Sequence, residues 1–381
     1  MRFPEFTEEW VNVSLKDVAD FQKERISSGL LDESTYISTE NILQNFQGVQ
    51  SAISIPANTN VVAYKKNDIL LSNIRPYLKK VWFSDRIGGC SADVFVLRSK
   101  TCEPEFLYNV IASDKFINYV MSGAKGVKMP RGDKNQMESF SFSIPAVVEQ
   151  RKISRLFQLL DERIVTQNKI IEKYESLIQA IIYQKKTDGI RKGNWQKTEL
   201  SEVLKERTEK NINDYTVCSV SLSQGVINQI EYLGRSFAAK ETSHYNVVKY
   251  GDIVYTKSPT GDFPYGIVKR SYIKNAVAVS PLYGVYKPIN DNIGVILHFY
   301  FMQSNNAFNY LHPLIQKGAK NTINITNTRF LENSIPLPKT ENEAVYIANA
   351  LTSIQTKIDT EKNLLRSYEK EKQYLLRQMF I

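Results

Sequence analysis

The sequence predicts an α+β protein in which two β-rich globular modules are separated by two long helices that form an antiparallel coiled coil, with a pseudo-two-fold internal repeat. Three observations predict this fold: landmarks recur in one order along both halves of the 381 residues, short β-type runs fill the first part of each half, and a long helix ends each half. At about 100–200 residues per domain, this length suits two or three domains.

The repeat is visible as matching landmarks in the two halves. The pairs are Trp10 with Trp195, Asp68 with Asp252, Gly123-Ala124-Lys125 with Gly318-Ala319-Lys320, and Ser143-Ile144-Pro145 with Ser334-Ile335-Pro336. A period of about 190 residues is far longer than the unit of a solenoid, so it indicates a duplicated domain.

The β-type runs are short and are broken by Gly, Pro and Asn, as in small mixed domains. Examples are 61–64, 68–72, 94–97 and 252–255, and a helical stretch is expected at 105–121 and at 292–312. We therefore predict target-binding modules at 1–148 and 188–340, a central helix at 149–187 and a distal helix at 341–381.

Both long helices carry an apolar seam with alternating spacings of four and three residues, a period of 3.5 that is typical of a coiled coil. The seam residues are Ile153, Phe157, Leu160, Ile164, Ile171 and Tyr174, and then Ile347, Leu351, Ile354, Ile358, Leu365 and Tyr368. Gln167 and Glu361 interrupt the seams at matching places; such a residue either fixes the register of the pair or meets solvent. Helices of about 36 residues would give a rod of about 54 Å.

Composition and motifs argue against catalysis by this chain. It contains no phosphate-binding loop, no dinucleotide-binding glycine motif, no zinc-protease motif and no Asn-Pro-Pro-aromatic motif of amino-methyltransferases. Three histidines leave little for a metal site, and we predict no metal ligands. Cys90, Cys102 and Cys218 lie far apart and suggest reduced thiols in a cytoplasmic protein. The sequence therefore predicts a non-catalytic binding protein without a membrane span.

A net charge of +9 is compatible with a polyanionic partner. The excess lies in residues 149–194 and 195–340, whereas residues 1–148 are balanced, so the first module would rely on local patches. Cations mixed with aromatic or Asn side chains suit contacts with phosphates and base edges. The candidate DNA-binding residues are Arg75, Tyr77, Lys79, Lys80, Lys125, Lys128 and Arg131 in the first half, and Lys257, Thr260, Lys317, Lys320 and Asn321 in the second. The alternative is that these loops are simply solvated.

The segment Ile144-Pro145 to Ile153, which includes Glu149-Gln150, and the following Leu159-Leu160-Asp161-Glu162-Arg163-Ile164 carry a family resemblance. With the duplication and the two tryptophan starts, the chain resembles the specificity subunit of type I restriction–modification enzymes over nearly its whole length. The second copy departs from the pattern, because Glu341-Asn342-Glu343 lacks the Glu-Gln pair.

The resemblance implies two target recognition domains that each read one half of a bipartite DNA sequence. The paired helices would set the spacing and dock two methyltransferase subunits, which bring S-adenosylmethionine and methylate adenine. Two translocase–nuclease subunits, where present, would bring ATP and Mg²⁺. The chain would then be no enzyme by itself and would need no cofactor of its own.

Two other functions are weighed against this one. A self-contained restriction–methylation enzyme would need a methyltransferase domain that the sequence does not show. A non-catalytic scaffold whose β modules bind protein or glycan would bind with little dependence on salt, whereas phosphate contacts give a steep dependence.

Overall fold

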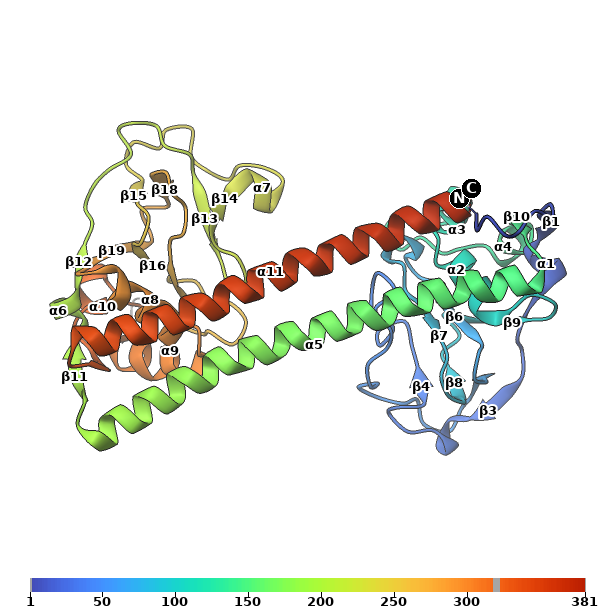
Figure 1. The fold of residues 1–381 in the computed structure, drawn as a ribbon, viewed down its shortest axis with the longest axis horizontal. Helices are drawn as coiled ribbons and strands as arrows, with labels where there is room; N and C mark the ends of the chain where they lie inside the picture. The colour runs from blue at the N-terminus through green and yellow to red at the C-terminus, as the bar shows by residue number, and fades with distance from the viewer. Residues whose placement is uncertain (1, 318–322, 381) are drawn as a thin grey trace. The chain divides into compact units, whose positions relative to one another are not determined.

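The computed structural model describes residues 2–317 and 323–380. The chain divides into two compact units (Figure 1). Unit 1 consists of Met1–Asn168 and Leu364–Ile381, whereas unit 2 is the continuous stretch Lys169–Asn363. Each unit therefore combines one β-rich module with a part of both long helices, and each is described by itself.

The module of unit 1 has two four-stranded sheets, with orders β2-β9-β6-β7 and β3-β5-β8-β4, and a separate pair β1-β10. Its strands are β1 (Val11–Ser14), β2 (Ala19–Phe21), β3 (Arg25–Ser27), β4 (Tyr36–Ile37), β5 (Asn60–Tyr64), β6 (Ile69–Ser72), β7 (Val81–Phe83), β8 (Gly88–Cys90), β9 (Val94–Ser99) and β10 (Ser141–Ile144). Its helices are α1 (Leu15–Val18), α2 (Pro104–Ile111), α3 (Asp114–Ser122) and α4 (Lys134–Glu138).

The module of unit 2 has one four-stranded sheet, β12-β19-β16-β17, and four two-stranded pairs. Its strands are β11 (Trp195–Glu199), β12 (Leu204–Glu206), β13 (Cys218–Ser221), β14 (Gly225–Asn228), β15 (Asn246–Val248), β16 (Ile253–Tyr255), β17 (Val268–Arg270), β18 (Val277–Val279), β19 (Gly284–Pro288), β20 (Gln316–Lys317), β21 (Ile323–Asn324) and β22 (Ser334–Pro338). Its helices are α6 (Leu200–Val203), α7 (Gln229–Leu233), α8 (Asp291–Phe301), α9 (Ser304–Leu311) and α10 (Asn327–Phe330).

The two modules share the topology of one four-stranded sheet and of the closing pair, which confirms the predicted internal repeat. The sheet β2-β9-β6-β7 corresponds strand for strand to β12-β19-β16-β17, and the closing pair β1-β10 corresponds to β11-β22. The helical stretches predicted at 105–121 and 292–312 are each broken into two helices. In unit 1 the break follows from Ser113, whose Oγ accepts a hydrogen bond from the Phe116 N–H at 3.2 Å and so begins α3.

A buried aspartate stands at the start of β6 and of β16. Asp68 accepts two hydrogen bonds from the Arg98 guanidinium, both at 2.7 Å, and Asp252 accepts two from Arg207 at 2.6 and 2.9 Å. Both carboxylates also accept from a backbone N–H three residues earlier, at Lys65 and Lys249. The same pair is thus built twice, but Arg98 belongs to β9 whereas Arg207 follows β12.

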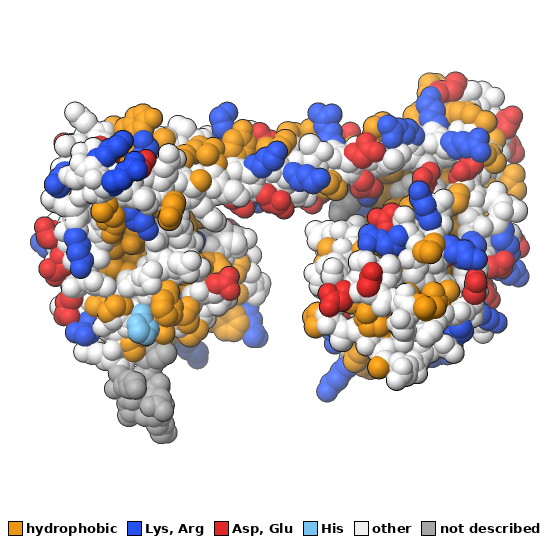
Figure 2. Space-filling view, turned by 90° about the horizontal axis from the view of Figure 1, so that it is seen from below, with side chains coloured by type: hydrophobic (Ala, Val, Ile, Leu, Met, Phe, Trp, Pro, Cys, Tyr) orange, Lys and Arg blue, Asp and Glu red, His pale blue; other side chains and the backbone are white. Residues whose placement is uncertain are grey.

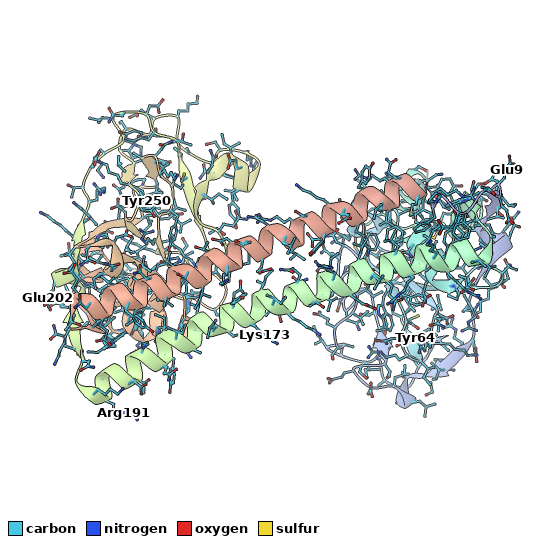
Figure 3. All side chains as sticks on the ribbon, in the orientation of Figure 1. Glu9, Tyr64, Lys173, Arg191, Glu202 and Tyr250 are labelled. Carbon is cyan, nitrogen blue, oxygen red and sulfur yellow. The ribbon has the colours of Figure 1, made fainter. Side chains whose placement is uncertain are left out.

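Helices α5 (Val147–Lys192) and α11 (Glu341–Met379) pair antiparallel in each unit. In unit 1, Lys372 forms an ion pair with Asp161 at 2.5 Å and the Arg163 Nε donates to the Tyr368 hydroxyl at 3.0 Å. In unit 2, Lys362 pairs with Glu175 at 2.7 Å. The side of α5 away from this pairing carries exposed side chains such as Lys173 and Arg191 (Figure 3).

Every residue of the predicted seams is buried or half-buried. Gln167 is also buried, with 5% of its surface exposed, so the interpretation that it meets solvent is wrong. Helix α5 is longer than predicted, 46 residues, and α11 has 39.

Helix α5 runs on past the predicted boundary because a glycine inside it makes room for a tryptophan. A Cβ at Gly189 would lie 1.9 Å from Cδ1 of Trp195. The helix then ends at Gly193, which has φ +72°, with the Asn194 N–H bonded to the Gly189 carbonyl and the Gly193 N–H to the Ile190 carbonyl. This pair of bonds is a Schellman ending, and glycine provides its left-handed residue.

The hydrophobic core of unit 1 includes the last turn of the chain. Phe380 packs on Phe106 and on Phe157, with ring centroids 5.4 and 6.1 Å apart, and Leu376 and Met379 belong to the same buried cluster. Residues from both ends of the sequence therefore build one core.

All three cysteines are free and buried. No helix in the described part of the chain is both long enough and apolar enough to span a bilayer. Within those residues there is also no cluster of three or more His, Cys, Asp or Glu side chains suited to hold a metal ion.

Candidate nucleic-acid interface

Two loops of the first module, 73–80 and 123–131, are joined by backbone hydrogen bonds, and we call them the joined loops. The Arg75 N–H donates to the Pro130 carbonyl at 2.8 Å, and the Gly132 N–H donates to the Asn73 carbonyl at 3.2 Å. The structure thus brings the two basic patches of the first half into one surface, although about 50 residues separate them in the sequence.

Loop 73–80 leaves the end of β6 and holds the short 3-10 helix η2 (Pro76–Leu78). Arg75 and Lys79, on either side of η2, have left-handed backbone angles, φ 52° and 53°. Such angles are uncommon for residues other than glycine and persist where the surroundings hold them. The loop exposes the Arg75 side chain and 48% of Tyr77.

Lys79 and Lys80 are engaged within the protein. The Lys79 Nζ pairs with Asp114 at 2.5 Å, and Arg377 of α11 contacts the same carboxylate at 3.0 Å. Hydrogen bonding from Lys79 holds the pKa of Asp114 below its usual value. The Lys80 Nζ donates to the Thr39 carbonyl at 2.5 Å, and burial lowers its pKa. Both lysine side chains are therefore held by contacts within the protein and do not project freely from the loop.

Loop 123–131 is a closed hairpin-like turn. Lys125 and Arg131 exchange two backbone hydrogen bonds of 2.9 Å. Their side chains are tied to carboxylates, Lys125 to Asp133 at 3.0 Å and Arg131 to Asp93 at 2.8 Å. Lys128 at the tip is exposed and has no ion-pair partner among the residues that the structure describes.

In the second module, the loop after β16 holds Lys257 and Thr260. Thr260 and Phe263 exchange two backbone hydrogen bonds of 3.0 Å, which close a tight turn. Burial lowers the pKa of Lys257, which is half-buried beside Glu206. The ring of Tyr265 lies 5.8 Å from that of His312, so this loop also adjoins the segment that leads to the second hairpin.

That hairpin, β20-β21, takes the place of loop 123–131. Gln316 pairs with Asn324 and Lys317 with Ile323. Lys320 and Asn321 lie outside the described residues, and the Lys317 side chain is not described either. Counting back from the first turns of α4 and α10, Arg131 corresponds to Asn324 and its partner Lys125 corresponds to Gln316. The Gly-Ala-Lys of the second half, Gly318-Ala319-Lys320, lies outside the described residues.

Lys and Arg side chains alternate with Asp and Glu on the face shown in Figure 2, without one continuous basic area. Sequence reasoning found the cations of the joined loops but missed the acids that tie them, Asp93, Asp114 and Asp133. Asp133 lies close in sequence to Lys125 and Arg131, but no local pattern links Asp114 to Lys79, because 35 residues separate them.

The family model described as "Type I restriction modification DNA specificity domain" matches residues 7–176 and 192–369, one match in each half of the repeat. The chain belongs to this family. Its two modules, with the adjoining helix segments, are thus two DNA specificity domains of a type I restriction–modification specificity subunit.

Curated relatives agree with this assignment. The chain is 23% identical over 398 residues to the type I restriction enzyme MjaVIII specificity subunit of Methanocaldococcus jannaschii, covering 97% of this chain and 91% of that protein. It is 24% identical over 187 residues to the EcoDI specificity subunit of Escherichia coli, a match that covers 47% of this chain and 42% of that protein.

A solved structure has the same fold. The S subunit of a type I restriction–modification system from M. genitalium matches with a TM-score of 0.62 over 98% of this chain and 96% of that one, at 12% identity. The two proteins therefore have the same fold although few of their residues are identical.

Proposed function

We propose that each specificity domain reads one half of an interrupted DNA target, and that this chain supplies sequence recognition to a complex whose other subunits carry out the chemistry. One observation carries the proposal: the same four-stranded sheet and closing pair are built twice, but the loops at the corresponding places differ in length and in residues. Shared scaffolds with different loops suit two readers of different sequences.

The joined loops suggest how the first domain holds DNA. Arg75 and Lys128 are exposed cations on adjacent loops, able to meet phosphates or guanine edges. Lys125 and Arg131 form the backbone bonds that close the hairpin, and their side chains are paired with carboxylates. Their role is therefore to position the loop, and they would contact DNA only if it displaced Asp133 and Asp93. Tyr77 adds an aromatic ring that can pack on a sugar or base.

The coiled coil suggests how the complex is assembled. Its buried seam stabilises the pair, while the outer sides of α5 and α11 remain free for other chains. We assign them the docking of two methyltransferase subunits, with two translocase–nuclease subunits where the system restricts DNA. In this proposal those partners bind S-adenosylmethionine, ATP and Mg²⁺, and this chain binds none of them.

The test is co-expression of the chain with the methyltransferase encoded beside its gene, followed by single-molecule methylome sequencing of the host DNA. The expected result is methylated adenine in one interrupted motif. Exchange of residues 195–340 for another module should then change one half of the motif and leave the other half intact. A contiguous motif would contradict the proposal.

A salt titration of DNA binding separates this function from the scaffold alternative. Neutralising several phosphates makes the logarithm of affinity fall steeply with the logarithm of salt concentration, by about 0.9 per phosphate contact. Binding to protein or glycan that barely responds to salt, together with no new methylation, would favour the scaffold.

A further inference from the structure

Loop 123–131 is basic in composition, but it also exposes two apolar side chains near its tip. Val127 is completely exposed, with a relative accessibility of 101%, and Met129 is 48% exposed. Lys128 lies between them, and Gly126 takes φ +97° just before them. Two exposed apolar side chains within three residues of one basic loop offer an apolar contact to a partner that the cations attract.

The tip is held in place from several sides. Lys125 and Arg131 close it with two backbone hydrogen bonds, Pro130 accepts the N–H of Arg75, and the side chains of Lys125 and Arg131 are tied to carboxylates. The ends of the loop are therefore fixed on either side of Val127. Such preorganisation lowers the entropic cost of binding.

The dimensions and chemistry of B-DNA indicate where such a tip fits. The major groove, about 12 Å wide, admits a two-stranded ribbon, whereas the minor groove is only about 6 Å wide. In the major groove the base edges offer hydrogen-bond donors and acceptors and one apolar group, the 5-methyl of thymine. An apolar tip flanked by cations therefore complements a thymine between phosphates.

We propose that Val127, in the same loop as the half-exposed Met129, packs against the 5-methyl group of a thymine in the half-target that the first specificity domain reads. This inference rests on the proposed function. It makes Val127 a specificity-determining residue, whereas Lys128 contributes attraction to the backbone.

The experiment uses the full chain in its complex with the methyltransferase and a duplex of the mapped target. The first domain's half-target is the one left unchanged when residues 195–340 are exchanged. Each thymine in it, on either strand, is replaced in turn by deoxyuridine, which lacks only the methyl group. Affinity is measured by fluorescence anisotropy at one salt concentration.

At one position the loss of the methyl should weaken binding of the original chain about fourfold, the value of one buried methyl group. Val127→Ala should weaken binding to the thymine duplex to a similar extent and abolish the difference between thymine and deoxyuridine. Leu30→Ala is the matched control, because Leu30 is 77% exposed in the same module but belongs to the segment directly after β3 and not to the joined loops, and it should behave as the original chain.

Three results would overturn the inference: no thymine in that half-target, no effect of deoxyuridine at any position, or a fourfold effect that persists in Val127→Ala. Unstacking of 2-aminopurine by the original chain but not by Val127→Ala would also overturn it, because it would show insertion between base pairs. A complex that binds DNA without sequence preference would instead overturn the proposed function.

Discussion

At the scale of single residues, two buried groups decide how firmly the modules are held. Asp68 with Arg98, and Asp252 with Arg207, place a buried carboxylate at the start of the matching strands β6 and β16. Replacing a buried carboxylate by a neutral side chain leaves the charge of its partner uncompensated. The resulting loss of stability is larger than the net stabilisation that the intact pair provides.

Asp68→Asn should lower the free energy of unfolding by about 3 kcal/mol, because it leaves Arg98 without its counter-charge. Chemical denaturation measures this directly. Glu24→Gln is the control, since Glu24 pairs with Lys65 on the surface at 3.2 Å with both side chains more than half exposed, and should change little. Equal effects of the two substitutions would contradict this role for Asp68.

His298 gives the second module a pH dependence. It is buried, its Nδ1 accepts a hydrogen bond from the Arg270 N–H at 3.1 Å, and burial, with Lys269 and Arg270 nearby, lowers its pKa to about 3. Because the folded pKa lies below the unfolded value, the unfolded chain takes up the proton first. Stability is therefore fully present above about pH 6.5 and falls as the pH drops towards 3.

Between pH 7 and pH 5 the free energy of unfolding should fall by about 2 kcal/mol from this group. Burial lowers the pKa of Lys269 to about 8, so this lysine is charged in both states over that range and adds no slope. His298→Gln keeps a hydrogen-bond acceptor and should flatten the profile. An unchanged profile in that variant would show that another group titrates.

At the scale of elements, the periodic features were predictable and the non-local ones were not. The seam of α5 and α11 follows from a local period, and the buried runs of β6 and β16 follow from their composition. The arginine that pairs with the buried aspartate could not be found in the same way, because Arg98 lies in β9 whereas Arg207 follows β12.

The length of α5 shows the same limit. Glycine disfavours the interior of a helix, and the sequence predicts that the central helix ends at residue 187. Gly189 nevertheless lies inside α5, where Trp195 packs against it. For a similar reason, the sequence predicts the cations of the candidate site but not the contacts that they make. Its cations stand in local patterns, but only the fold shows that Lys79 is tied to Asp114 and that Lys125 corresponds to Gln316.

Gly189→Ala should destabilise the protein by about 2 kcal/mol, although the same change at an open helix position would stabilise it. The added methyl group would overlap Trp195, whose Nε1 donates to Glu343 at 3.1 Å. Thermal unfolding measures the effect, with Ser176→Ala on the exposed side of α5 as the control. A stabilising result would show that Trp195 can move without cost.

At the scale of the whole molecule, affinity for DNA should depend on the cations that are free rather than on all cations of the basic loops. Lys128→Ala should reduce the salt dependence of binding by about one phosphate contact, a slope change of about 0.9. Lys79→Ala should leave the slope nearly unchanged, because Asp114 already neutralises Lys79. Equal slope changes would mean that DNA displaces Asp114.

The way the sequence threads through the two units has a consequence for synthesis on the ribosome. Unit 2 is one continuous stretch, whereas the core of unit 1 is closed by Leu376, Met379 and Phe380, which follow unit 2 in the sequence. Domains usually fold in the order in which they emerge, but here the module made first is completed last. A premature stop codon between unit 2 and Leu376 would therefore leave the core of unit 1 incomplete and spare unit 2, although unit 2 is encoded nearer to it.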